Sequence, residues 1–279
     1  MSAPALQRAS DLRGQSGVSP LRPTLYEVLC VVKYTRIRPR FPRRATISLA
    51  FERPVERSRV LLLKRLPFCL FLVAASSLAL LGQAGPPDRT VSGSVVSSSH
   101  DPKIEIGIPG AARYLGADRW LLYDLADCEL HAFVESDDRK EVKRLYWIQF
   151  EAYLPSRPDL VHTYDSPRHT TLGGLDFYVD TWPRADGEKS PPGSDREHIE
   201  ALIRSKGYRM PAGMMYVRLV HLIDQAKRKE LMIIYGEDLA STGFTAADLE
   251  EHGRAREKWP AIETGLIDRA EKSISLRAP

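Results

Sequence analysis

The sequence predicts an α+β domain over residues 104–279, in which helices cover a mainly antiparallel sheet. Three observations predict this fold. Runs rich in aromatic and β-branched residues are joined in pairs by short polar turns, helix-capping signals occur between and after these runs, and a basic and apolar leader precedes them all. A single domain behind an export signal therefore accounts for the chain.

The strands are predicted from alternation and from composition. Within residues 175–182, Leu175 and Phe177 fall on one face and polar or hydroxylated residues alternate with them. Polar turns at 136–140 and 224–228 are suited to joining their flanking segments into hairpins. The predicted strands are residues 129–135, 142–153, 175–182, 214–223 and 229–237.

Capping residues mark the helices. Ser194 and Glu197 have the spacing of a capping box, and Gly207 follows as a C-terminal cap. A second helix is predicted to begin at Thr245 and to run toward Trp259, with an interruption at Pro260. We expect the helices to cover one face of the sheet. The terminal helix carries an apolar stripe of Ile262, Leu266, Ala270 and Ile274.

The net charge of +4 hides two parts of opposite sign. Residues 1–65 carry 14 Lys and Arg against four Asp and Glu, whereas residues 86–279 carry 26 basic residues against 32 acidic ones. The basic character therefore belongs to the leader. Because the folded part is mildly acidic, nucleic acid is excluded as an expected partner.

The leader has the three parts of a secretory signal. Basic residues precede an apolar core of 14 residues at 68–81, and Gly82-Gln83-Ala84 then offers a small-x-Ala cleavage site. Fourteen residues are fewer than the roughly 20 that a membrane-spanning helix needs. We therefore favour a signal peptide cleaved after Ala84, with the domain periplasmic or extracellular.

An uncleaved signal anchor is the alternative interpretation of residues 55–84. The uncharged run at 66–87 is 22 residues long, so it is long enough to span a bilayer. The basic flank would keep the N-terminus cytoplasmic and place the domain outside, with membrane contact through residues 66–84. Both interpretations export the domain.

The segments on either side of this signal are predicted to lack regular structure. Residues 1–54 mix Arg with Pro, and one hypothesis is that translation begins near Val55 or Val60 instead of Met1. Residues 85–103 are rich in Ser, Gly and Val, so we expect a flexible tether there. Cys128 is the one cysteine after the leader, and we interpret it as a small, half-buried residue at a strand start, with acidic neighbours that raise its pKa.

The first candidate site is the loop at 162–169. It offers His162, Asp165, Arg168 and His169, a combination that can share a metal ion or hold a carboxylate or phosphate. The spacing matches no established metal motif, so the sequence specifies neither a metal nor a cofactor.

The second candidate site is the polar face of the predicted strands. Asp176, Tyr178 and Asp180 share that face and are expected near Arg218. Asp176 and Asp180 are four residues apart, about 13 Å along a strand, so they cannot share one proton. The catalytic candidates are His169, Asp176 and Asp180. The ligand-binding candidates are His162, Asp165, Arg168, His169, Tyr178 and Arg218.

Three functional hypotheses follow. The first is an exported domain that binds a small or lipid-like ligand, or a protein partner, without catalysis; the absence of a recognisable catalytic motif favours it. The second is an exported hydrolase, metal-assisted in one version, that uses the 162–169 loop. The third is an envelope structural protein tethered to the membrane by an uncleaved leader.

Overall fold

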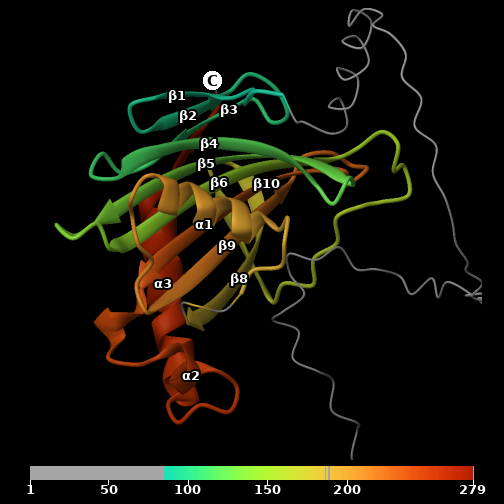
Figure 1. The fold of residues 1–279 in the computed structure, drawn as a ribbon. Helices are drawn as coiled ribbons and strands as arrows, with labels where there is room; N and C mark the ends of the chain where they lie inside the picture. Colours follow the sequence, from blue (N-terminus) through green and yellow to red (C-terminus); the bar gives the residue numbers. More distant parts are fainter. Residues whose placement is uncertain (1–84, 186, 188, 279) are drawn as a thin grey trace, which may run out of the picture. The chain divides into compact units, whose positions relative to one another are not determined.

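The computed structural model describes residues 85–185, 187 and 189–278, which contain two antiparallel sheets and few helices (Figure 1). The predicted leader lies outside the described residues. The larger sheet has seven strands, in the order β4 (Arg113–Leu122), β5 (Ala126–Ser136), β6 (Val142–Tyr153), β10 (Lys229–Asp238), β9 (Gly213–Leu222), β8 (Leu175–Ala185) and β7 (Arg168–Leu172). The smaller sheet has the order β1 (Thr90–Ser92), β2 (Val95–Ser98), β3 (Ile104–Gly107) and β11 (Ser275–Arg277).

The described α-helices are α1 (Asp195–Ser205), α2 (Ala246–Leu249) and α3 (Trp259–Ser273), of which α2 is only four residues long. Single 3-10 turns lie at Leu239–Thr242 and Arg256–Lys258. In Figure 1, α1 crosses one face of the larger sheet and α3 runs behind the other. None of the helices in the described part of the chain has both the length and the apolar character needed to cross a membrane.

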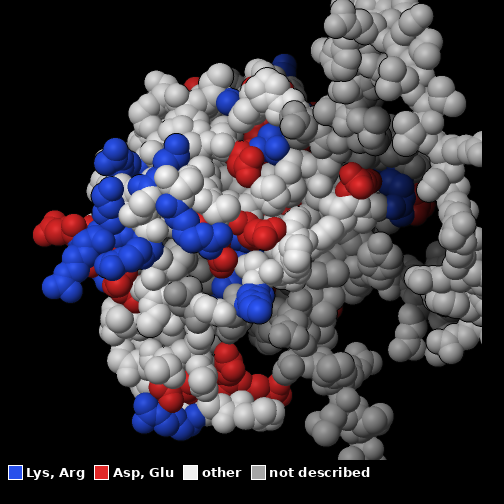
Figure 2. Space-filling model, in the orientation of Figure 1, with Lys and Arg blue, Asp and Glu red and all other residues white. Residues whose placement is uncertain are grey.

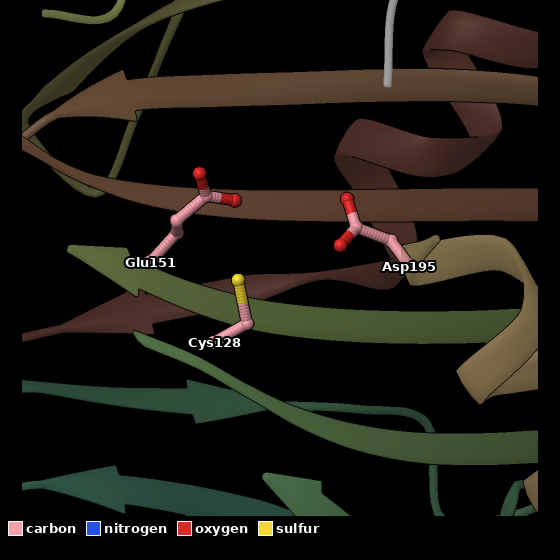
Figure 3. A group of neighbouring side chains, drawn as sticks. All are labelled: Cys128, Glu151 and Asp195. Atoms are coloured by element: carbon pink, nitrogen blue, oxygen red, sulfur yellow. The ribbon is translucent and has the colours of Figure 1, made fainter. Parts of the chain in front are cut away.

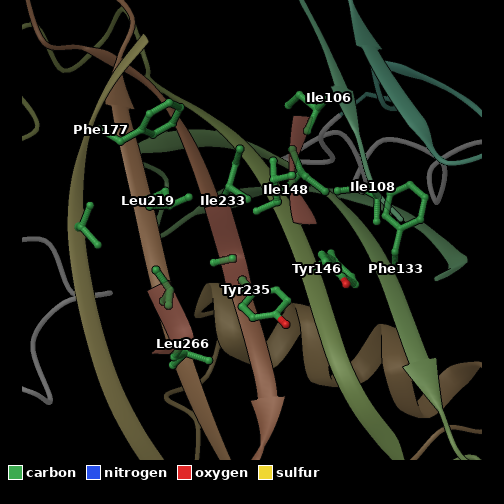
Figure 4. Packing of buried hydrophobic residues seen from close by; sticks show 14 of the residues in the cluster. Ile106, Ile108, Phe133, Tyr146, Ile148, Phe177, Leu219, Ile233, Tyr235 and Leu266 are labelled. Carbon is green, nitrogen blue, oxygen red and sulfur yellow. The ribbon is translucent and has the colours of Figure 1, made fainter. Parts of the chain in front are cut away.

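The larger sheet is buried on both faces, because apolar side chains of successive residues in its strands point alternately to one face and to the other. One face, called the α3 face here, packs against α3 and the smaller sheet (Figure 4). Its core members include Phe133, Tyr146, Ile148, Phe177, Leu219, Ile233 and Tyr235, with Leu266 of α3 and Ile106 of β3 packed on them. The other face, called the α1 face, packs Leu130, Trp147, Met232 and Ile234 against Ile199 and Ile203 of α1.

The predicted antiparallel sheet is confirmed, and its hairpins follow the expected turns. Each of the five predicted strands coincides with an observed strand to within three residues at either end, because alternating apolar residues and polar turns both specify it. The cover of the sheet differs from the expectation, since helices and the second sheet bury both faces instead of one.

Residues 85–103, expected to be a flexible tether, contain β1 and β2. Val96 is fully buried and pairs with Ile106 of β3, which pairs in turn with Leu276 of β11. A few Val residues among Ser and Gly were enough for a short strand once a partner from the end of the chain was available. The sequence distance between those partners hid the pairing.

The second helix also differs from the expectation. Thr245 does cap a helix, but α2 ends after Leu249, and residues 250–255 form turns before α3 begins at Trp259. Pro260 stands in the first turn of α3, where a missing N–H is tolerated, so it begins a helix and does not interrupt one. The apolar stripe of α3 is confirmed, with Leu266 and Ala270 fully buried.

Candidate functional site

The loop that follows β6 crosses the α1 face of the larger sheet. His162 is buried against the ring of Tyr153, at 4.3 Å between centroids, and its Nδ1 lies 3.0 Å from Oε2 of Glu230. The Tyr164 hydroxyl donates to the same carboxylate oxygen at 2.6 Å. Arg228 fixes the path of this loop by donating to three of its backbone carbonyls and to that of Tyr153 at the end of β6. The loop therefore delivers one predicted residue, His162, to a buried carboxylate.

Two further predicted residues lie close to this loop. The guanidinium of Arg218 is buried, donates to Asp180 Oδ2 at 2.6 Å and lies 5.2 Å from the ring centroid of Tyr164. Tyr178 packs beside Tyr164, with 5.5 Å between ring centroids. The structure thus gathers His162, Tyr178 and Arg218 around Tyr164.

The other predicted residues lie elsewhere. Asp165 is exposed, and His169 is exposed on β7 against the ring of Tyr178. Arg168 reaches the opposite face and pairs with Glu263 of α3 at 2.6 Å. Asp176 is exposed and accepts a hydrogen bond from Thr171, so it does not join Asp180.

A buried cluster that the sequence interpretation missed lies next to Glu230. It consists of Cys128 on β5, Glu151 on β6 and Asp195 at the start of α1, all buried, with one donor atom from each within 4.8 Å of the others. Figure 3 shows the two carboxylates facing each other, with the sulfur of Cys128 below and between them in this view. We call these three residues the acid–thiol cluster.

Local structure explains how these three side chains meet. Cys128 and Glu151 are direct cross-strand partners, so both point to the α1 face. Ser194 caps α1 by accepting a hydrogen bond from the Glu197 N–H, which places Asp195 in the first turn above the sheet. Glu230 is the partner of Glu151 on the other side, in β10. Three adjacent strands and one helix end thus converge.

Burial and like charge control protonation in the cluster. Burial, followed by the negative charges of Glu230 and Asp195, raises the pKa of Glu151 well above its usual range. Hydrogen bonds with Cys128 and Gln149 act in the opposite direction and are weaker. Burial and the nearby carboxylates also raise the pKa of the Cys128 thiol. Without a cation, burial and the neighbouring carboxylates therefore favour the protonated forms of Glu151 and Cys128.

The donor set fits a transition metal better than other ions. Thiolate sulfur prefers soft or borderline ions such as Zn²⁺, and carboxylates complete such sites, whereas Ca²⁺ and Mg²⁺ favour oxygen alone. In a tetrahedral zinc site, neighbouring sulfur and oxygen donors are about 3.5 Å apart. The cluster atoms, within 4.8 Å of one another, need only a small contraction to reach that spacing.

One signal in the sequence pointed toward this cluster. Glu151 and Glu230 are acidic residues inside strands whose neighbours are strongly apolar, a position that demands a partner or a proton. Cys128 was interpreted as a half-buried residue at a strand start, but it is fully buried within β5. Its raised pKa agrees in direction with the sequence argument.

Comparisons with known proteins supply no further assignment. No protein-family model matches the chain, and neither the curated proteins nor the solved structures gave a significant match. The functional argument therefore depends on the described residues alone.

Proposed function

We propose that this domain binds one divalent transition-metal ion through Cys128, Glu151 and Asp195. The observation that carries the proposal is the convergence of one thiol and two carboxylates, all buried, within 4.8 Å. Bringing such groups together in a low-dielectric interior is unfavourable unless protons or a cation neutralise them. A metal ion does this directly, because it displaces the protons from Glu151 and Cys128.

The balance of buried charge supports a cation. Glu230 adds a third carboxylate beside the acid–thiol cluster and is 3% exposed. Arg218, a buried cation on this face, pairs with Asp180. His162 contacts Glu230 through Nδ1, and its buried Nε2 has no hydrogen-bond partner among the described residues. The described structure therefore places three buried carboxylates, those of Glu151, Asp195 and Glu230, close to one thiol.

A titration of the purified full chain with Co²⁺ tests the proposal. A thiolate–cobalt site gives an intense near-ultraviolet charge-transfer band, and we expect one equivalent of Co²⁺ to saturate it. Cys128→Ser should abolish this band, and Glu151→Gln should weaken binding at least tenfold. Asp176→Asn, an exposed carboxylate on the same sheet, is the matched control and should bind like the native chain.

Metal content measured on the native protein gives an independent result. About one Zn²⁺, Fe²⁺ or a similar ion per chain is expected after purification without chelator. A chain that carries no metal, shows no cobalt band and binds no Zn²⁺ by calorimetry would refute the proposal, and would leave the cluster as a set of protonated acids.

A metal-assisted hydrolase is the second candidate function. Three protein donors leave a coordination position for water, as in catalytic zinc sites. In this version Glu230, held by Tyr164 and His162, is the proton acceptor, in place of His169, Asp176 or Asp180. Hydrolysis of 4-nitrophenyl acetate that disappears in Glu230→Gln, while cobalt still binds, would favour catalysis over binding alone.

The exported location remains part of the proposal. It is supported by the basic flank, the apolar core at 68–81 and the small-x-Ala site. The mass of the protein recovered from the non-cytoplasmic fraction tests it. A mass that begins at Gly85 would indicate cleavage, and a mass that retains residues 66–84 would indicate an anchor.

A further inference from the structure

One end of the larger sheet is a compact surface formed by three turns. The β4–β5 turn joins the loop after β6 through a hydrogen bond from Leu154 N–H to the Leu125 carbonyl at 2.9 Å. The β9–β10 turn joins the same loop, because Lys227 and Arg228 accept hydrogen bonds from His162 and Tyr153. We call this surface, made of residues 123–125, 154–162 and 224–228, the turn end.

The turn end exposes apolar side chains. Tyr123 is 37% exposed and Val161 is 47% exposed, and they are the two large hydrophobic residues that are exposed within the described part of the chain. Both stand on turns that the hydrogen bonds above hold together. These two side chains therefore offer apolar surface at this end that lipid can contact.

The first described residues are fastened close to this end. Arg119 donates to the Pro86 carbonyl at 2.8 Å and pairs with Asp88 at 2.9 Å. It also pairs at 2.6 Å with Asp127, which follows the β4–β5 turn by two residues. Glu129 accepts hydrogen bonds from the N–H groups of Asp88 and Arg89, each at 2.8 Å. The chain therefore enters the domain beside the turn end.

The chain that precedes this entry limits how far the domain can lie from a membrane. The apolar core of the leader ends at Leu81, four residues before Gly85. Four residues span at most about 14 Å when fully extended. If residues 66–84 stay in a bilayer, Gly85 must therefore lie within that distance of the end of the apolar core.

The opposite end of the sheet has a different character. Figure 2 shows Lys and Arg gathered where β5 finishes. Lys140 and Arg209 are exposed there and joined by a backbone hydrogen bond, and Arg139 and Lys206 are exposed on the neighbouring turn and helix end. Strands of 11 and 12 residues separate the two ends by about 35 Å. This basic end cannot touch the bilayer while the turn end faces it.

We propose that in the membrane-attached chain the turn end lies on the lipid surface, with Tyr123 and Val161 in the interface and the basic end directed away. Tyrosine favours the membrane interface because its ring is apolar and its hydroxyl is polar. Two such side chains give a weak contact alone. The short connection raises their effective concentration at the bilayer, so that a weak contact is enough to orient the domain.

The test uses the full chain with Cys30 and Cys69 changed to Ser, reconstituted in phosphatidylcholine vesicles with and without phosphatidylglycerol. Val161→Cys carries an environment-sensitive fluorophore at the turn end, and Asp138→Cys carries it at the exposed basic end as the matched control. Cys128 is fully buried, so labelling under native conditions spares it. Both labelled positions are exposed, so the fold should tolerate them.

We expect the label at 161 to shift to shorter wavelength and to be quenched by nitroxide lipid in both vesicle types, while the label at 138 does neither. Changing Tyr123 to Ser should reduce the quenching at 161 at least twofold. An unquenched label at 161 would overturn the proposal. Quenching at 138 that requires phosphatidylglycerol would also overturn it, because the basic end would then be the docking surface.

Discussion

Buried carboxylates on the two faces of the larger sheet have different neighbours. On the α3 face, each strongly buried carboxylate meets donors. Glu263 accepts from Arg168 and Thr181, and Glu237 accepts from Arg269 through two nitrogens at 2.8 and 2.9 Å. On the α1 face, the carboxylates of Glu151 and Asp195 meet each other and a thiol. The same strands thus place paired carboxylates on one side and bring carboxylates and a thiol together on the other.

The pKa values express this difference most clearly for two glutamates. Burial raises the pKa of Glu129, but hydrogen bonds from His131 and from the backbone N–H groups of Asp88 and Arg89 outweigh it and lower that pKa to about 2. Burial also raises the pKa of Glu151, and there the neighbouring charges are negative and raise it further. Neighbours, more than depth, therefore decide which glutamate is ionised.

Removal of Glu129 should have the largest effect on stability. Glu129→Ala leaves Arg89 and His131 without their buried partner, and breaking a buried, hydrogen-bonded pair costs about 3–5 kcal/mol. Urea unfolding followed by circular dichroism measures the loss. The exposed control Asp138→Ala should change the free energy of unfolding by less than about 0.5 kcal/mol. A loss below about 1 kcal/mol would show that stability depends less on the charge pairs of Glu129 than its contacts indicate.

The pH dependence of stability should separate the two faces next. The folded pKa of Glu129 is about 2, below the ordinary 4.5, so its contribution is present above pH 4.5 and is lost as the pH falls toward 2. At 1.36 kcal/mol per unit this contribution is about 3 kcal/mol. The folded pKa of Glu151 is raised, so its contribution is present at low pH and is lost as the pH rises through that value.

Unfolding in urea with EDTA, measured from pH 3 to pH 8.5, checks both directions. The loss of stability at low pH should disappear in Glu129→Ala, and the loss of stability at higher pH should disappear in Glu151→Gln. If Glu151→Gln retained the loss at higher pH, another group would be responsible and the account of the α1 face would be wrong.

Glu151→Gln should have a smaller effect of opposite sign on the metal-free protein. The amide carries no charge at any pH, so the variant avoids the ionised carboxylate that burial and the charges of Glu230 and Asp195 disfavour. We expect stabilisation of about 1 kcal/mol at pH 8, by urea unfolding in EDTA. With excess Zn²⁺ the order should reverse, because the native chain gains about 2.7 kcal/mol when the free metal is 100 times its Kd and the variant gains less. Destabilisation without metal would contradict this prediction.

The strands could be predicted from the sequence because alternation and turns are local properties. The acid–thiol cluster could not, because it depends on register. An irregularity between Glu135 and Ser136 shifts the β5–β6 pairing by one residue. Without that shift Cys128 would oppose Phe150, whose side chain lies on the other face. The residues of the turn at 136–140 do not predict this irregularity.

Long-range pairing limited the rest of the prediction. The smaller sheet joins Ile106 to Leu276, and the cluster needs α1 to place Asp195 over strands that precede it by dozens of residues. The Ser194 cap was visible in the sequence, and it did define the start of α1, although the Glu197 side chain accepts from the N–H of Gly193 and not from that of Ser194. The sequence did not predict which strands of the larger sheet the first turn of α1 would contact.

The smallest expected effect separates helix stability from metal binding. Ser194→Ala removes the cap of α1 and should cost about 1 kcal/mol of unfolding free energy. Because that cap fixes Asp195 at the cluster, the same change should also weaken Co²⁺ binding. Thr245→Ala is a matched control, since Thr245 caps α2 through an identical 3.3 Å bond to the third helical N–H but carries no cluster residue.

We expect the two variants to lose similar stability and only Ser194→Ala to lose cobalt affinity, in a titration that uses the charge-transfer band. Equal affinities would show that Asp195 is positioned by the sheet contacts of α1 and not by its cap. Equal losses of affinity would show that metal binding follows global stability. In that case the start of α1 would have no specific part in the site, and Cys128 and Glu151 would be the donors that the α1 face supplies.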